Sequence, residues 1–246
     1  AGWWLDLLGL AFNPTMPCFL DGHGGNTSLL NILKRKAQDG VDVRVLGWVN
    51  WSVMGLGSFA KLSSDAAGWR DHFVKTIKAI EALRAQPELA SKCCLNIIGH
   101  AAGAVHLKLV VIGNNADAVG YTGSLDFVSD RHSDDLHTAS NSMIDIGWRH
   151  ELVAKVEGAA VQALYDFFKQ VWDEVIARPV KTYRVGSNNV PSVVIPGTTS
   201  IPPRSLPTIQ IAKHHVQSLR TIPADNYKQF SILPWSGDPI SFAWAA

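Results

Sequence analysis

Amphipathic helical patterns alternate with short apolar runs along the first hundred residues of the chain. Residues 26–40 open with three cap-forming side chains, place leucines and an isoleucine at helical spacing, and stop at Gly40, which is typical of a helix. Residues 41–48 alternate apolar and polar side chains, as a half-buried strand does. A second helix is predicted at 69–85 and a further strand at 93–99. Strands that alternate with helices predict an α/β fold with helices packed on the sheet.

The same pattern continues through the middle of the chain. The run VHLKLVVIG (105–113) is apolar enough for a buried strand, and AVGYTGSLDF (118–127) predicts a second one. The sequence IGNNAD between them is a turn, so the two strands are expected to form a hairpin. A third helix is predicted at 158–177.

Composition narrows the class of protein. The chain has 246 residues, of which 47% are apolar and 17% charged, and this is the composition of a globular protein. Its net charge of +1 provides no attraction of the whole molecule towards DNA, so nucleic acid is not expected as a partner. No apolar run is long enough to span a membrane. We expect a soluble protein, peripheral to membranes at most, and the sequence leaves the compartment open.

The cysteines and histidines give no metal site. Three cysteines cannot build a disulfide framework, and the adjacent pair Cys93–Cys94 lacks the spacing of a metal-binding knuckle. Opposite faces of one strand would explain that pair. Three further histidines, His132, His137 and His150, also lack metal-ligand spacing and are interpreted as structural or surface residues. No metal and no cofactor are therefore predicted.

The composition changes after Arg178. Six of the twelve prolines lie between residues 179 and 207, in a stretch rich in Ser, Thr and Val. Such a segment is expected to be an extended linker or a long surface loop. The predicted domains are accordingly a first lobe at 1–178, a Pro-rich linker at 179–215 and the start of a second lobe at 216–246.

Two protonatable side chains stand at the beginning of the apolar run 105–113. His106 and Lys108 are two positions apart, which places both on one face of a strand. A neutral imidazole is a good nucleophile towards an anionic phosphodiester, and a lysine can neutralise the phosphoryl oxygens. Taken alone, such a pair in a strand is more often two ordinary surface residues than a site.

The predicted hairpin would place two small residues near this pair. A turn at Asn114 would bring Gly123 and Ser124 back towards His106 and Lys108. Backbone N–H groups and a hydroxyl at such a small-residue corner are suited to holding a phosphate. The combination favours a phosphate-handling site over surface decoration.

At this point the chain resembles the phospholipase D superfamily. HLKLVVIG followed by VGYTGSLDF is similar to the His-x-Lys-x4-Asp signature and the Gly-Ser element of that family. DRHSDDLH resembles the Arg-x-Asp-Asp-x-His stretch of many members, and GWRHELVAKVEGAAVQALYDFFKQVW resembles the segment and helix that follow it. Upstream, AGWWL and LLNILKRKAQDGVDVRVLGW are similar to the first strand and the first helix–strand unit. LRTIP and GDPISFAWA resemble the entry into the second half of two-motif members.

The resemblance implies a fold and an activity. The fold would be a phospholipase D-like lobe, a mixed β-sheet flanked by helices in a layered α/β/α sandwich. The activity would be cleavage of glycerophospholipids at a membrane or micelle surface to phosphatidic acid and a headgroup alcohol, through a phosphohistidine, with transphosphatidylation as a related outcome. His106 and Lys108 would be catalytic, while Gly123, Ser124, Asp126 and Asp134 would bind the phosphate or support the site. Asp134 and its neighbour Asp135 are equally consistent with an exposed acidic loop.

Two departures from the family pattern define what else is expected. Gly113 stands where the signature has its Asp, and Asp117 in the turn is interpreted as a solvated turn residue. The chain has one His-x-Lys, whereas two-motif members build one site from two. We therefore expect half of a bilobal enzyme, inactive alone, whose partner lobe is a missing C-terminal half or a symmetry mate.

Two alternatives remain open. Gly113 favours a non-catalytic lipid-binding module that keeps the fold. A nuclease on the same fold is a further possibility that the near-zero net charge disfavours.

Overall fold

The structure is a computed structural model that describes part of the chain. Described are residues 2–9, 12–15, 28–49, 66–96, 107–128, 151–177, 198–204 and 206, with the side chains of 66–72 left out.

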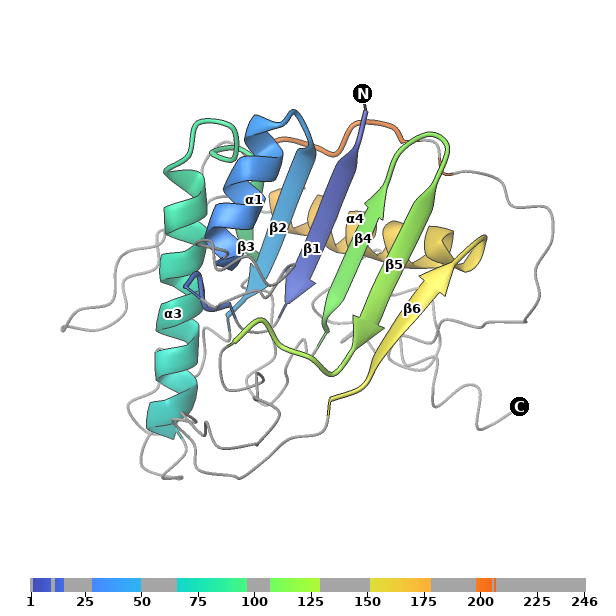
Figure 1. The fold of residues 1–246 in the computed structure, drawn as a ribbon. Helices are drawn as coiled ribbons and strands as arrows, with labels where there is room; N and C mark the ends of the chain where they lie inside the picture. The colour runs from blue at the N-terminus through green and yellow to red at the C-terminus, as the bar shows by residue number, and fades with distance from the viewer. Residues whose placement is uncertain are drawn as a thin grey trace.

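The described residues form a six-stranded mixed sheet in the order β3-β2-β1-β4-β5-β6 (Figure 1). Its strands are β1 (Trp4–Gly9), β2 (Asp42–Trp48), β3 (Cys93–Asn96), β4 (Leu109–Gly113), β5 (Ala118–Gly123) and β6 (Val153–Glu157). The first three strands run parallel to one another, whereas β4 runs antiparallel to β1, β5 to β4, and β6 to β5. Parallel neighbours need helical crossovers, and the described helices between β1 and β3 are of that kind.

Helices cover both faces of the sheet. The helices α1 (Leu29–Gln38) and α3 (Ala66–Arg84) pack on β2, and α3 also packs on β3. The helix α4 (Ala160–Ala177) lies behind the sheet in Figure 1 and crosses β1, β4, β5 and β6. These contacts give three layers, α/β/α, around a mixed sheet, as predicted.

The caps of α1 explain where this helix begins and ends. The Ser28 hydroxyl accepts a hydrogen bond from the Asn31 N–H at 3.3 Å, which satisfies one free donor of the first turn. At the other end, Gly40 has a φ of +84°, and its N–H donates to the Ala37 carbonyl. The N–H of Val41 donates to the Lys36 carbonyl, which completes a Schellman motif.

Strand β2 differs from its prediction. The alternation in residues 41–48 predicted a half-buried strand, but six of the seven residues of β2 are buried. Val43 and Val45 join the core beneath α1 and α3, while Leu46 joins the core beneath α4. The prediction was wrong because Arg44, although polar, is only 3% exposed.

The cysteine pair lies on β3 as the alternation argument expected. Cys93 belongs to the core on the α1 and α3 side, and Cys94 belongs to the core on the α4 side. Both thiols are free and buried. Burial raises the pKa of Cys93 to about 12 and also raises the pKa of Cys94.

The strands of the hairpin are shorter than predicted. β4 begins at Leu109, and Leu107 and Lys108 precede it without a ladder partner. β5 ends at Gly123, because the chain bends at Ser124. The predicted turn is present, with Asn114 donating its N–H to the Asp117 carbonyl at 2.8 Å.

One aromatic and aliphatic face of α4 fills the second core. Its buried residues are Val161, Tyr165, Phe167, Phe168, Val171 and Trp172. The spacing of Val161, Tyr165, Phe168 and Trp172 is that of a single helical stripe. Within the part of the chain that the structure describes, no helix is long and apolar enough to cross a membrane.

Candidate functional site

The predicted site lies at one edge of the sheet. Lys108 immediately precedes β4, and Gly123 closes β5, so the hairpin brings both to the end opposite its turn. The antiparallel pairing of Leu8 with Leu109 places the carboxyl end of β1 at this edge as well. The carboxyl ends of parallel strands are where open α/β sheets usually bind ligands.

Lys108 is buried and paired with a carboxylate. Its Nζ lies 3.4 Å from an Asp126 carboxylate oxygen, and each side chain is only 3% exposed. A buried ammonium needs a counter-charge, because water no longer solvates it. Asp126 supplies this counter-charge and fixes the position of the lysine ammonium.

The hairpin register brings the predicted residues together. Leu109 pairs with Thr122, and the Thr122 hydroxyl donates to the Lys108 carbonyl at 3.1 Å. The next positions outward are Lys108 on one strand and Gly123 on the other. The return of the Gly-Ser corner towards Lys108, expected from the turn, is thus observed in the backbone.

Ser124 is engaged by the chain that leads into β6. Its hydroxyl accepts a hydrogen bond from the Leu152 N–H at 2.9 Å, and its own N–H donates to the Leu152 carbonyl at 2.9 Å. The Ser124 N–H is consequently occupied, so it is not free to hold a phosphate in this arrangement. The Ser124 side chain is exposed, and its hydroxyl donates weakly to the Leu152 carbonyl at 3.5 Å.

Gly123 is required by this close contact. A Cβ at this position would lie 1.9 Å from the Leu152 carbonyl oxygen, far inside any allowed contact. The glycine thus lets the bend after β5 approach residue 152. The contact gives Gly123 a steric role, and its phosphate-binding role stays a prediction from the sequence.

An apolar cavity of about 220 Å³ adjoins Lys108. Its walls include Val110, Tyr121, Phe127 and Val153, and Lys108 is its charged lining residue. The cavity is lined almost entirely by apolar atoms and lies next to the buried Lys108 side chain, so it suits the apolar part of a ligand.

The residue that follows Asp126 is anchored by an aromatic contact. Phe127 forms a bridge with Phe12, and their rings stack with centroids 5.3 Å apart. The Asn13 N–H also donates to the Phe127 carbonyl at 2.8 Å. The residue after Asp126 is thereby tied to the segment that follows β1, so the carboxylate is carried on an anchored backbone.

Position 113, where the signature of the resembled superfamily has Asp, has no room for a side chain in this structure. Gly113 is at the opposite end of β4 from Lys108, and a Cβ there would lie 2.6 Å from the Trp4 ring. No carboxylate fits at 113 while Trp4 keeps this place. Asp117 is exposed in the turn, at the same far end of the hairpin, which agrees with a solvated turn residue.

Two predicted residues cannot be placed. His106, the predicted nucleophile, and Asp134, the predicted supporting acid, lie outside the described residues, as do Asp135, His132, His137 and His150. The adjacency of His106 and Lys108 therefore stays a prediction. The described part shows Lys108, Gly123, Ser124 and Asp126 gathered at one edge.

Sequence reasoning missed two features. The resemblance named Asp126, but its ion pair with Lys108 was not predicted. The available signal was the lone lysine in an apolar run, because a buried cation needs a counter-charge. Sequence reasoning also passed over Asp6, the lone acidic residue in the apolar run WWLDLLGL, whose carboxylate is fully buried.

Comparison with known proteins gave no match, since neither a protein-family model nor a curated protein is similar to the chain in sequence. The resemblance to the phospholipase D superfamily accordingly remains a prediction from the motifs.

Proposed function

We propose that the chain is a phosphodiesterase of the phospholipase D type that cleaves glycerophospholipids to phosphatidic acid and a headgroup alcohol. The observation that carries the proposal is Lys108, a buried cation beside an apolar cavity at the sheet edge to which the Gly-Ser corner returns. A phosphodiester with an apolar body matches that combination of charge and surface.

The proposed reaction has two displacements at phosphorus. The imidazole nitrogen of His106 forms a bond to phosphorus while the bond from phosphorus to the headgroup oxygen breaks. The headgroup leaves as an alkoxide and takes a proton from a general acid. Water, or another alcohol in a transfer reaction, then attacks phosphorus, breaks the phosphorus–nitrogen bond and loses its proton to the same group.

Lys108 is proposed to stabilise the charge on the non-bridging oxygens. Its ammonium is fixed by Asp126, so little reorganisation is needed when negative charge develops. Desolvation strengthens this interaction because few water molecules screen a side chain that is 3% exposed.

The general acid is proposed to come from a second lobe. A second histidine suits the task because its ordinary pKa lies near neutrality. The second lobe would be another part of the same protein or a second copy of the chain, packed against this edge of the sheet.

The test is headgroup release from phosphatidylcholine in detergent micelles by the full-length protein. Lys108→Met alone leaves Asp126 buried without its counter-charge, so the double variant Lys108→Met/Asp126→Leu is needed to restore folding. We expect the double variant to melt near the wild-type temperature yet to lose at least about a hundredfold in activity, the typical loss when one oxyanion-stabilising group is removed. Lys36→Met, which changes a lysine of α1 whose side chain is 45% exposed, is the matched control.

A second candidate is a non-catalytic lipid-binding module, favoured by one observation. The charge of Lys108 is already balanced by Asp126, as in a structural ion pair. Wild-type protein that binds phosphatidic acid vesicles without headgroup release would favour this module. Full activity in the folded double variant would exclude Lys108 from catalysis.

A further inference from the structure

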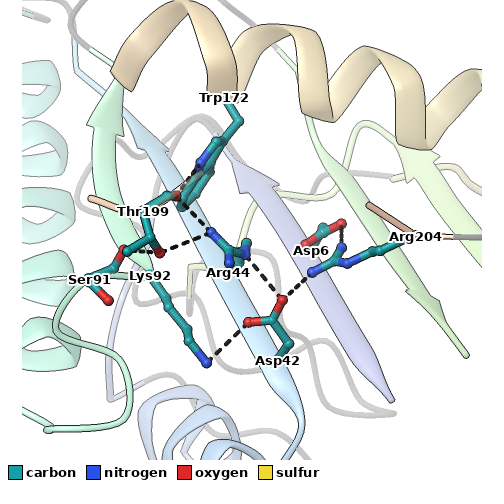
Figure 2. A network of polar contacts seen from close by, with 8 residues as sticks. All are labelled: Asp6, Asp42, Arg44, Ser91, Lys92, Trp172, Thr199 and Arg204. Atoms are coloured by element: carbon teal, nitrogen blue, oxygen red, sulfur yellow. Dashed lines mark hydrogen bonds and ion pairs between the residues drawn. The ribbon is translucent and has the colours of Figure 1, made fainter. Parts of the chain in front are cut away.

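A short segment beyond α4 lies across the other end of the sheet. Residues 198–204, here called the strap, contain neither helix nor strand, yet they contact β1, β2, α4 and the turn before β3 (Figure 2). The strap falls within the stretch 179–215 that the sequence predicted to be a linker. Part of that linker is thus held against the first lobe.

Thr199 fastens the beginning of the strap through its backbone. Its carbonyl accepts hydrogen bonds from Arg44 at 2.9 Å and from the Trp172 indole at 3.1 Å. Its N–H donates to the Ser91 carbonyl at 2.9 Å. These bonds reach β2, α4 and the turn before β3, so Thr199 is tied both to the sheet and to the α4 layer.

Arg204 fastens the end of the strap in a cradle formed by Trp4, Asp6, Asp42 and Tyr165. One guanidinium nitrogen pairs with Asp6, and the other pairs with Asp42 at 2.6 Å. The guanidinium also lies 4.6 Å from the Trp4 ring centroid and 5.8 Å from that of Tyr165. Two carboxylates from neighbouring strands and two aromatic rings thus surround one planar cation.

The cradle is suited to arginine in particular. A guanidinium directs two N–H groups at two separate carboxylates and stacks on aromatic rings, whereas an ammonium does neither in the same way. The Arg204 side chain is only 5% exposed, so these contacts are largely shielded from water and salt.

The sheet and α4 also position the cradle, although the strap adds Ile201 to the core beside Trp4 and Tyr165. Trp4 and Asp6 are held by the pairing of β1 with both β2 and β4, and Tyr165 belongs to the helical stripe of α4. Asp42 also has Arg44 at 3.2 Å and Lys92 at 3.1 Å as charged partners. Removing the strap breaks no bond of the sheet ladder and leaves Asp42 with two cations.

We propose that the cradle is a docking site for an arginine-bearing extended segment, occupied by the strap of the same chain, and that the strap leaves as one unit while the sheet and its helices stay folded. This inference does not rest on the proposed reaction.

Proton binding at Asp6 supports a reversible contact. Burial raises the pKa of Asp6 to about 7, against the opposing charges of Arg204 from the strap and Arg44 from β2. Asp42 on β2 adds to the rise, and Tyr165 is the titratable group facing it from α4. Arg204 lowers this pKa, so the contact between the strap and the cradle is linked to the ionisation of Asp6.

Hydrogen exchange of the full chain tests the proposal. The Thr199 amide reports the strap, and the amides of β2 report the sheet. We expect Arg204→Lys to speed exchange at Thr199 at least tenfold and to leave β2 protection unchanged. Arg35→Lys on the exposed face of α1 is the matched control and should change neither.

Wild-type protein in low urea gives the same answer without a variant. Thr199 should exchange through an opening that depends on urea less steeply than the opening of β2, because a local opening exposes less surface. Equal steepness, or joint loss of protection at both places in Arg204→Lys, would show that the strap is part of the cooperative core and would overturn the proposal.

Two further measurements examine the proton and the occupant. After correction for intrinsic exchange, the exchange rate of Thr199 should differ between pH 6 and pH 8 in wild type but not in Asp6→Asn, and an unchanged pH dependence in this variant would exclude Asp6 as the group that titrates. Strap protection that rises with protein concentration would instead show docking on a second copy and would overturn the assignment to the same chain.

Discussion

Two buried ion pairs occupy opposite ends of the sheet and differ in how they are built. At one end, Lys108 pairs with Asp126, which follows the hairpin closely in sequence. At the other end, Arg204 pairs with Asp6, 198 residues away, and also with Asp42. The first pair joins residues close in sequence, whereas the second joins distant residues and belongs to a network of several charges. The comparison teaches that equal burial does not imply equal dependence on a partner.

The largest expected effect is the difference between losing Lys108 and losing Arg204. Lys108→Met leaves the Asp126 carboxylate buried without its cation, which should lower the free energy of unfolding by about 3–5 kcal/mol. Arg204→Met should cost less, about 1–3 kcal/mol, because Asp42 keeps Arg44 and Lys92 and because Asp6 can take up a proton. Urea titration at pH 6 measures both. Equal losses would remove the distinction between the two ends.

The next effect is the pH dependence contributed by Asp6. Its pKa is raised to about 7 in the folded state, so its contribution to stability is full below the ordinary pKa near 4 and is lost as the pH rises through 7. Relative to Asp6→Asn, wild type should lose about 2–3 kcal/mol of unfolding free energy between pH 5 and pH 8. Parallel curves for the two proteins over this range would contradict the burial of a titrating carboxyl. Asp42 should act in the opposite sense below pH 4, because its pKa is lowered.

The two ends of the hairpin should differ in how much stability a Gly→Ala substitution costs. Gly123→Ala places a Cβ 1.9 Å from the Leu152 carbonyl oxygen, which belongs to the backbone. Gly113→Ala places one 2.6 Å from the Trp4 ring, which is a side chain that can shift. We expect a loss of about 3 kcal/mol for Gly123→Ala and about 1–2 kcal/mol for Gly113→Ala, measured by thermal unfolding. The reverse order would mean that the bend at Ser124 yields more easily than the packing of Trp4.

The smallest effect comes from two exposed hydroxyls. Ser124→Ala removes the acceptor of the Leu152 N–H, at a cost of about 1 kcal/mol. Thr199→Val should cost about half as much or less, because the strong contacts of Thr199 use its backbone and its hydroxyl contacts are 3.3 and 3.5 Å long. Matched denaturation curves test the order. A larger loss at Thr199 would show that its side chain, and not its carbonyl, holds the strap.

Local signals predicted most of the fold. The caps around α1 and the turn at Asn114 each act over a few residues, so α1 and the hairpin were predicted, although the hairpin strands are shorter than expected. The alternating faces of Cys93 and Cys94 followed from strand geometry alone.

Long-range charge pairing could not be predicted in the same way. Arg44 appeared to be a solvent-facing residue of a half-buried strand, yet it is buried by Thr199 and by the Trp172 ring at 5.4 Å. Arg204 appeared to be part of a free linker, because nothing in the Pro-rich sequence names a partner near the N-terminus. At the candidate site the hairpin predicted the return of Gly123 towards Lys108, but the ion pair with Asp126 depends on the bend at Ser124.

The rate of thiol alkylation at each cysteine of β3 can report the opening of one helical layer. Cys93 faces the core under α1 and α3, and Cys94 faces the core under α4, so neighbouring residues sample opposite sides of one strand. Buried thiols with raised pKa values stay protonated near neutral pH, and a protonated thiol alkylates slowly. Labelling at Cys93 therefore times the opening of one helical layer, and labelling at Cys94 times the opening of the other. Equal labelling rates at the two sulfurs would mean that both helical layers open in a single event. Unequal rates would show which layer opens more slowly.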